Sequence, residues 1–145
     1  MDGVTLVDLT DRLDDPAIRG LLALAMGQPS AETLAALGER YRCEPNWTLL
    51  GHAEYGVGCV GVERAGRDCL VIRHIAVTPA CRRQGIGRAL LAALGEQEPS
   101  RWFVAETDGE AVGFYRRCGF AVESLGERYP GVERFRCTRQ PRGRQ

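Results

Sequence analysis

The chain has 145 residues, of which 44% are apolar and 26% charged, and its 19 basic residues balance its 19 acidic ones. This size and balance are typical of one globular domain, so we predict a single domain over residues 1–145. The zero net charge disfavours a nucleic-acid surface, and no apolar run approaches the roughly 20 residues of a membrane-spanning helix. The acidic N-terminal segment lacks the basic and apolar regions of a signal peptide. We therefore expect a cytoplasmic protein that contacts neither membrane nor nucleic acid.

The chain's basic, cysteine and histidine side chains exclude several kinds of chemistry. All 19 lysine or arginine positions hold arginine, which excludes a Schiff-base lysine and a lysine-bearing phosphate loop. The six cysteines include no Cys-x-x-Cys pair, and the only histidines are His52 and His74, so we predict no metal site. We expect these scattered cysteines to be reduced and mostly buried.

The first half of the chain is predicted to form a strand, two helices and a sheet. A short strand is expected over residues 4–9, followed by a helix that begins at Asp14-Asp15-Pro16 and ends at Gly27. Ser30 is expected to cap a second helix, which ends before Pro45. From Trp47 the apolar period changes to that of strands, and three consecutive strands that end near Val77 are expected to form an antiparallel meander.

The second half is predicted to alternate helices and strands. A helix follows the glycine loop at residues 85–87, with Gly95 as its C-terminal stop, and a strand follows at residues 102–106. A short helix after Asp108 ends at Gly119, and two strands, at 120–124 and 132–138, complete a mixed α/β domain. Trp47 and Trp102 are expected in the core.

Residues 69–95 predict a binding function most directly. They are expected to form a buried strand, a short basic loop with glycines and a helix that starts on those glycines. The N-terminus of a helix has unpaired N–H groups and a partial positive charge, and glycines let an anion approach them closely. Arg82, Arg83 and Arg88 add to the positive charge. The segment therefore predicts a cradle for a pyrophosphate.

Two segments resemble motifs of the GNAT superfamily of N-acetyltransferases. Residues 82–87, Arg-Arg-Gln-Gly-Ile-Gly, match the family's signature [QR]-x-x-G-x-[GA], and residues 107–120 resemble its second motif, downstream at a suitable distance. In the second motif, the expected alanine, tyrosine, glycine and aromatic positions are held by Ala111, Tyr115, Gly119 and Phe120. The resemblance covers nearly the whole chain, and it implies a mostly antiparallel α/β sheet, splayed between two strands and flanked by helices.

Other nucleotide and hydrolase motifs do not fit the same residues. A dinucleotide fingerprint needs a small residue where Leu90 stands, and a Walker loop needs a lysine. A nucleophile elbow needs Gly-x-Ser-x-Gly, which the chain lacks.

The resemblance implies acetyl-coenzyme A as co-substrate, without a metal, and transfer of its acetyl group to a primary amine by direct attack in a ternary complex. Backbone N–H groups from Gln84 to Ala89 would hold the pyrophosphate, and the main chain at residues 75–77 would hold the pantetheine arm. Tyr115 would act as general acid and protonate the departing thiolate. The predicted cofactor-binding residues are Ile75, Ala76, Val77, Arg82, Arg83, Gln84, Gly85, Ile86, Gly87, Arg88, Ala89, Asp108 and Tyr115.

The chain departs from the family pattern at several positions. Asp108 stands where the family usually has asparagine, and a carboxylate accepts a hydrogen bond but donates none. The two positions where family members carry a glutamate base hold Val71 and Phe103. Among candidate bases we rank His74 first, because its reference pKa is near neutral and it lies on the central strand. For His74 itself, a hydrogen-bonded core histidine is the interpretation that we favour over a base. The other candidates are Glu54, Glu63, Glu106 and a chain of waters.

The sequence leaves the acceptor open. We expect a small-molecule amine, in a pocket formed by the two N-terminal helices, the turn at residues 54–56 and the loop at residues 126–131. A cationic amine would be attracted by scattered acids: Glu32, Glu39, Glu44 and Glu54. The alternatives are a protein N-terminus or lysine as acceptor, or a non-catalytic module that senses acyl-coenzyme A. A homodimer is a candidate assembly.

Overall fold

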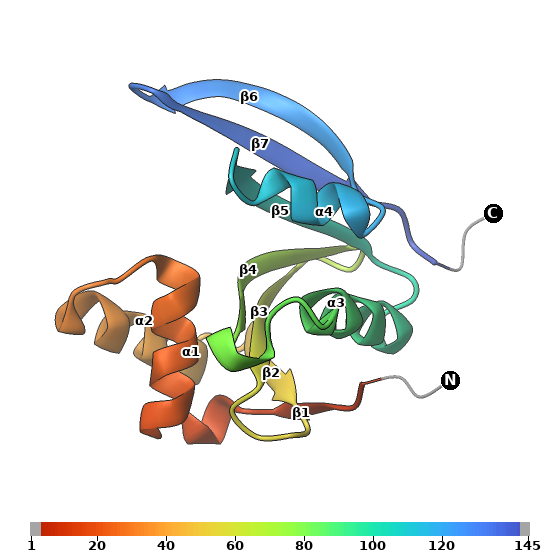
Figure 1. Cartoon of the computed structure of the whole chain (residues 1–145). Helices are drawn as coiled ribbons and strands as arrows, with labels where there is room; N and C mark the ends of the chain where they lie inside the picture. The colour runs from red at the N-terminus through yellow and green to blue at the C-terminus, as the bar shows by residue number, and fades with distance from the viewer. Residues whose placement is uncertain (1–3, 143–145) are drawn as a thin grey trace.

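The structure is a computed structural model that describes residues 4–142 (Figure 1). Its strands are β1 (Leu6–Asp8), β2 (Trp47–His52), β3 (Gly58–Ala65), β4 (Cys69–Val77), β5 (Trp102–Asp108), β6 (Ala121–Tyr129) and β7 (Val132–Arg139). Its α-helices are α1 (Pro16–Met26), α2 (Ala31–Cys43), α3 (Ile86–Gln97) and α4 (Val112–Arg117). Two short 3-10 helices, η1 (Thr10–Arg12) and η2 (Pro79–Cys81), lie in the connections. The predicted order of elements is confirmed.

The seven strands form one sheet in the order β1-β2-β3-β4-β5-β7-β6. All neighbours are antiparallel except β4 and β5, which run parallel. The β4–β5 pairing extends only from Cys69↔Trp102 to Ile72↔Ala105. Beyond these pairs the two strands separate, as Figure 1 shows. The predicted mixed, mostly antiparallel and splayed sheet is confirmed.

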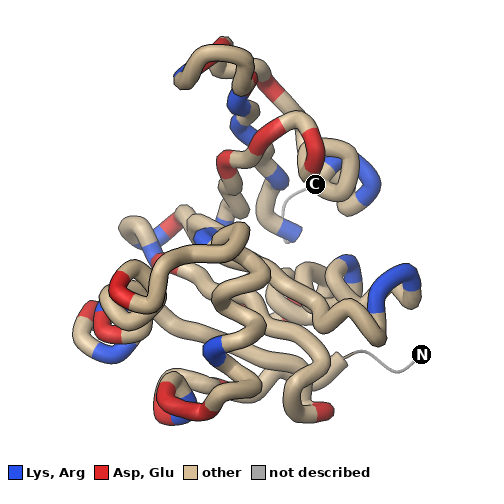
Figure 2. The backbone as a smooth tube through the Cα atoms, turned by 60° about the vertical axis from the view of Figure 1, so that its left-hand side comes forward, with Lys and Arg blue, Asp and Glu red and all other residues tan. Residues whose placement is uncertain are grey.

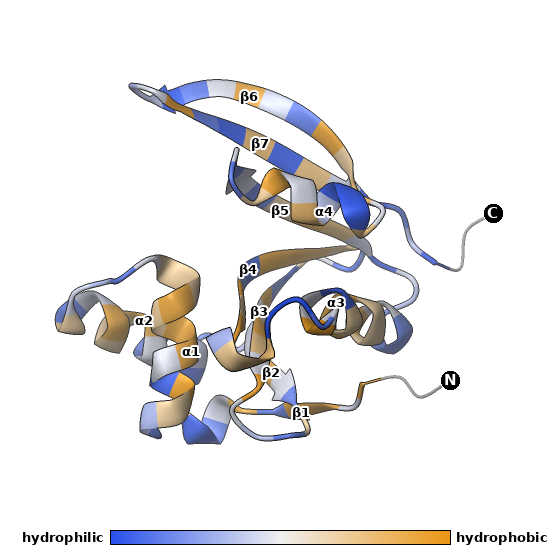
Figure 3. Cartoon of the chain, viewed as in Figure 1, coloured by the Kyte–Doolittle hydropathy of each residue, from blue (hydrophilic) through white to orange (hydrophobic). Residues whose placement is uncertain are grey.

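Helices cover the sheet on both faces, so adjacent strand residues enter different cores. Cys59 and Val60 of β3 are both fully buried, yet Cys59 packs in the cluster under α1 and α2, and Val60 in the cluster under α3 and α4. The strands that are covered on both faces are therefore mostly apolar, as at residues 69–72 of β4, whereas β6 and β7 alternate polar and apolar segments (Figure 3).

The predicted caps of the first two helices are confirmed. The side chain of Asp15 accepts a hydrogen bond from the Ala17 N–H at 2.9 Å, and Ser30 Oγ accepts one from the Thr33 N–H at 3.1 Å. Gly27 ends α1 with a φ of 72°, a left-handed conformation that glycine adopts without steric cost.

Two predictions about single residues are wrong. Gly95 does not end α3, which continues to Gln97; instead a Cβ at this position would lie 2.7 Å from a guanidinium nitrogen of Arg139. Trp102 is 37% exposed, whereas Trp47 is buried. Trp102 lies on the face of β5 opposite the buried Phe103, and helices α1 and α2 cover that face only over β2, β3 and β4.

The cysteines also differ from expectation. Cys59 and Cys137 are buried, whereas the other four are partly or fully exposed, and all six are free thiols. Within residues 4–142, no group of three side chains suits a metal ion, and no helix is long and apolar enough to cross a membrane.

The packing of α3 predicts an unequal response to two identical substitutions. Leu94→Ala removes a fully buried side chain and should lower the free energy of unfolding by about 3 kcal/mol, because it leaves a cavity. Leu24→Ala, at a helix position that is 43% exposed, should change it by less than about 0.5 kcal/mol. Urea titration measures both, and equal losses would contradict this description of the core.

Candidate functional site

The loop between η2 and α3 adopts the backbone that an anion site requires. Gly85 has a φ of 76° and Arg83 a φ of 66°, so the chain turns sharply before α3 begins at Ile86. No side chain of residues 4–142 caps this helix. The Ala89 N–H donates to the Gly85 carbonyl at 3.0 Å and is therefore engaged within the helix. The N–H groups that precede it in the first turn remain directed outward from the helix start.

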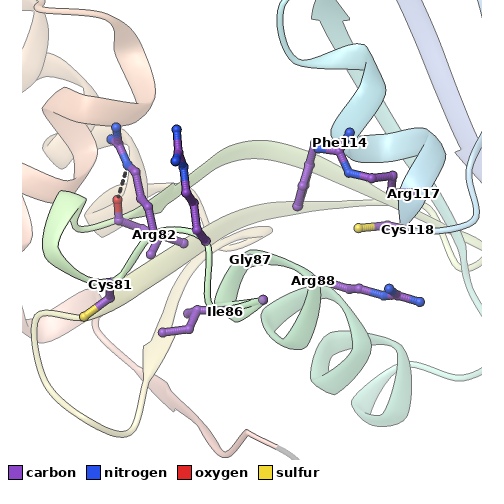
Figure 4. A pocket seen from close by; sticks show the side chains of 11 residues that line it. Cys81, Arg82, Ile86, Gly87, Arg88, Phe114, Arg117 and Cys118 are labelled. Atoms are coloured by element: carbon purple, nitrogen blue, oxygen red, sulfur yellow. Dashed lines mark hydrogen bonds between the residues drawn. The ribbon is translucent and has the colours of Figure 1, made fainter.

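Gly87 lets α4 approach the start of α3. A Cβ at this position would lie 3.1 Å from the ring of Phe114, which points from α4 toward the first turn of α3 (Figure 4). Between the two helices lies a cavity of about 470 Å³, which we call the cradle. Figure 3 shows that the loop before α3 is strongly hydrophilic.

Four arginines line the cradle: Arg82, Arg83, Arg88 and Arg117. None of them belongs to an ion pair within residues 4–142. Arg82 Nε donates to the Val77 carbonyl at 3.2 Å (Figure 4). Arg117 is not among the residues predicted from the sequence, and α4 brings it to the cradle from the second motif. The cradle therefore concentrates positive charge beside a helix N-terminus.

A larger cavity of about 1080 Å³, which we call the cleft, fills the opening between β4 and β5. Its lining includes residues 72–75 of β4, residues 106–108 of β5 and residues 24–27 at the end of α1. A third cavity of about 230 Å³ lies along residues 75–77. Arg82 and Phe114 line all three cavities, so the cradle and the cleft adjoin along the open edge of β4. Of the predicted cofactor residues, Gln84 and Ala89 line none of the three.

Tyr115 of α4 lines the cleft and is 5% exposed. Its ring packs edge-on against Phe114 and Phe120, with centroids 5.2 and 5.3 Å apart. Burial, with smaller contributions from Cys137 and Cys118, raises the pKa of the phenol well above its usual value. The hydroxyl therefore keeps its proton at neutral pH and is present in the cleft as a proton donor.

Asp108 stabilises the turn that precedes α4. Its Oδ1 accepts hydrogen bonds from the N–H groups of Glu110, at 3.0 Å, and Ala111, at 3.2 Å. This carboxylate oxygen satisfies N–H groups in the turn that leads into α4, a role for which an acceptor is sufficient.

His74 lies in the cleft wall, and its Nδ1 is 2.7 Å from the hydroxyl oxygen of Tyr41. Burial, and secondarily the charge of Arg73, lowers the pKa of His74 to about 4. The imidazole is therefore neutral at neutral pH. His74 is thus a hydrogen-bonded, largely buried histidine, as one interpretation of the sequence predicts, and it lies in a wall of the cleft.

The three candidate glutamates lie in different places. Glu63 is bound by Arg73, whose Nε donates to it at 2.9 Å, and Glu54 lies in the β2–β3 turn, away from the cleft lining. Glu106 lines the cleft, 3.5 Å from Arg136 in an ion pair. It is the first residue of β5 beyond the last β4–β5 pair.

The far side of the cleft is basic. A cavity of about 450 Å³ opens between β4, β5 and β7, and its charged lining residues are Arg73, Arg134, Arg136 and Glu106. Basic residues of β6 and β7 appear as blue stretches at the top of Figure 2. Of the predicted acceptor walls, only the end of α1 lines the cleft, and none of the four scattered glutamates does. The register that brings Arg134 beside Asp108 has no local sequence signal.

Residues 48–122 match the model of the acetyltransferase (GNAT) domain family. No curated protein sequence matches the chain.

Solved structures share the fold at low identity. A GNAT family acetyltransferase from Elizabethkingia anophelis with acetyl-CoA bound has a TM-score of 0.67 at 22% identity, with 97% of this chain and 99% of that chain covered. The aminoglycoside 6'-N-acetyltransferase from Enterococcus faecium gives 0.78 at 15%, with 98% of each chain covered. The ribosomal-protein-S18-alanine N-acetyltransferase from Escherichia coli gives 0.71 at 20%, with 98% and 96% covered.

The cradle predicts a charge-sensitive anion site. Gly85→Glu should weaken the binding of coenzyme A at least about tenfold, because a carboxylate would face the N-terminus of α3. Gly66→Glu is the matched control, since Gly66 also has a positive φ and open space around it, in the β3–β4 turn. Calorimetric titration measures both affinities. Equal effects of the two substitutions would show that the anion site lies elsewhere.

Proposed function

The chain belongs to the acetyltransferase (GNAT) family, and from that premise we propose that it is an N-acetyltransferase with a small-molecule primary amine as acceptor. The acceptor attacks acetyl-coenzyme A directly in a ternary complex. One observation carries this proposal: adjoining cavities run from the basic start of α3, along the open edge of β4, to Tyr115 in the cleft.

The donor half of the reaction uses the cradle and β4. The N–H groups at the start of α3 and the four cradle arginines bind the pyrophosphate. The pantetheine arm lies along residues 75–77, where β4 has no pairing with β5. Main-chain groups on this edge, other than the Val77 carbonyl that Arg82 bonds, can bond the amides of the arm. A backbone N–H of β4 polarises the thioester carbonyl, an interaction worth roughly 3 kcal/mol of barrier in other acyl transfers.

Tyr115 completes the transfer as general acid. The amine nitrogen forms a bond to the thioester carbon and loses a proton to solvent, and the tetrahedral intermediate then expels the sulfur. The Tyr115 hydroxyl, kept protonated by burial, gives its proton to the departing thiolate and regains one from solvent. The products are the N-acetylated amine and coenzyme A.

The acceptor ammonium must lose a proton before it attacks. His74 as the base stays a prediction, and its pKa of about 4 makes it a weak proton acceptor. We favour Glu106, directly or through water, because its side chain lines the cleft where β5 leaves β4.

The basic side of the cleft favours an acceptor with an anionic group such as a carboxylate. Arg73 and Arg136 are paired with Glu63 and Glu106, whereas Arg134 has no ion pair within residues 4–142. A guanidinium without a partner at the edge of a cavity suits a bidentate carboxylate. Charge complementarity therefore argues against a polycationic acceptor.

The role of Tyr115 predicts a loss of turnover. Tyr115→Phe should lower kcat about 100-fold, with little change in the affinity for acetyl-coenzyme A. Tyr55→Phe is the control, because the Tyr55 hydroxyl binds Asp15 on the surface. Release of the coenzyme A thiol across a panel of amines measures both. Full activity of Tyr115→Phe would show that Tyr115 is not the general acid. Tight binding of acetyl-coenzyme A without turnover on any amine would favour the alternative of a non-catalytic module that senses acyl-coenzyme A.

Arg134 predicts the charge preference of the acceptor. Arg134→Gln should raise the KM of a carboxylate-bearing amine about tenfold and leave that of its amide analogue nearly unchanged. Arg128→Gln, at an exposed β6 position outside the cavities, should change neither. Equal KM changes for both amines, or a preference for aminoglycosides, would contradict an anionic acceptor.

A further inference from the structure

The side chain of Tyr41 is packed between helix α2 and the sheet. It is 1% exposed, and its ring packs edge-on against Trp47 with centroids 5.2 Å apart. Its hydroxyl lies directly over Gly61 of β3, where a Cβ would overlap the hydroxyl oxygen. A glycine at position 61 is therefore needed for the Tyr41 hydroxyl to reach the sheet.

An irregularity in the β3–β4 pairing places His74 beside this hydroxyl. Gly61 pairs with His74 and Val62 with Ile72, so Arg73 is an extra residue in β4. His74 thereby lies across from Gly61, and its ring meets the Tyr41 ring edge-on. The distance from Tyr41 Oη to His74 Nδ1 is 2.7 Å, which is a good hydrogen bond.

The direction of this hydrogen bond follows from the protons available. Burial raises the pKa of Tyr41 far above neutrality, so the phenol carries a proton that needs an acceptor. Within residues 4–142 its side-chain hydrogen bond is the one to His74 Nδ1. Tyr41 therefore donates, and Nδ1 accepts with its lone pair. A neutral imidazole that accepts at Nδ1 carries its proton on Nε2.

The protonated nitrogen reaches the cleft. The two ring nitrogens point in nearly opposite directions, so Nε2 faces away from Tyr41. Nε2 has no hydrogen-bond partner among the described residues, and no described side-chain nitrogen or oxygen is both buried and without a partner. Because His74 is part of the cleft lining, its Nε2–H is accessible there.

We propose that His74 is a hydrogen-bond donor to an oxygen of the acceptor, with Tyr41 as the positioning residue that fixes its tautomer. Its Nε2–H and the Arg134 guanidinium then both face the acceptor side of the cleft. The role of His74 in binding the acceptor substrate rests on the transferase function proposed above. The tautomer of His74 is independent of that function, because it follows from the Tyr41–His74 contact.

Nitrogen NMR of the uniformly ¹⁵N-labelled chain tests the tautomer. The chain has two histidines, so a His52→Gln variant assigns the His74 signals. We expect Nδ1 of His74 at the shift of an unprotonated ring nitrogen and Nε2 at that of a protonated one. Tyr41→Phe should convert His74 to a mixture of tautomers. A wild-type His74 protonated at Nδ1 would overturn the proposal.

Acceptor kinetics test the role of the donor. His74→Ala should raise the KM of the acceptor about tenfold with little change in kcat, because a bond to a bound oxygen is lost. His74→Gln, which supplies an N–H but no base, should restore most of that loss, and His52→Gln serves as control. If both His74 variants instead lose kcat about 100-fold, His74 is a base and the proposal fails. A chain without turnover on any amine overturns the proposed function, and the NMR result still decides the tautomer.

Discussion

The end of the β4–β5 pairing is the constraint on which the rest of the site depends. Two parallel strands that part after Ile72 and Ala105 leave one edge of each without a partner in the middle of a sheet. Unpaired backbone groups are costly unless water or a ligand bonds them, so a divided sheet is stable only where its opening is accessible. The opening is the cleft, and the fold arranges helices at both of its ends. α3 begins beside the end of β4. The turn that Asp108 stabilises leads into α4, which brings Tyr115 and Phe114 to the same opening.

Charge is distributed unevenly along this run of cavities although the chain as a whole is neutral. At one end, four arginines that form no ion pair with any described residue lie around the start of α3. At the other end lie the paired Arg73 and Arg136, and beside them Arg134, which has no ion pair in the described part of the chain. The buried Tyr115 and the neutral His74 lie between the two ends. Such an arrangement suits two anionic groups on two different molecules, with the neutral chemistry of acyl transfer between them.

The features that sequence predicted are those that depend on neighbouring residues. Asp15 and Ser30 begin helices because their side chains bond N–H groups two or three positions away, and Gly85 precedes α3 because its backbone is left-handed there. The features it missed depend on the tertiary arrangement. A glycine commonly ends a helix, but Gly95 lies within α3, where the Arg139 guanidinium of β7 leaves no room for a Cβ. Arg117 joins the cradle through the position of α4, and Arg134 joins the cleft through the β5–β7 register. The Tyr41–His74 bond needs both a glycine on a third element and an extra residue in β4.

The central claim is that one continuous site, from the start of α3 to the opening between β4 and β5, holds acetyl-coenzyme A for transfer. A crystal structure of the chain with acetyl-coenzyme A tests it most directly. The claim predicts the pyrophosphate against the first N–H groups of α3, the pantetheine along residues 75–77, and the sulfur within hydrogen-bonding distance of the Tyr115 hydroxyl. A coenzyme bound outside the gap between β4 and β5, or with its sulfur remote from Tyr115, would contradict it.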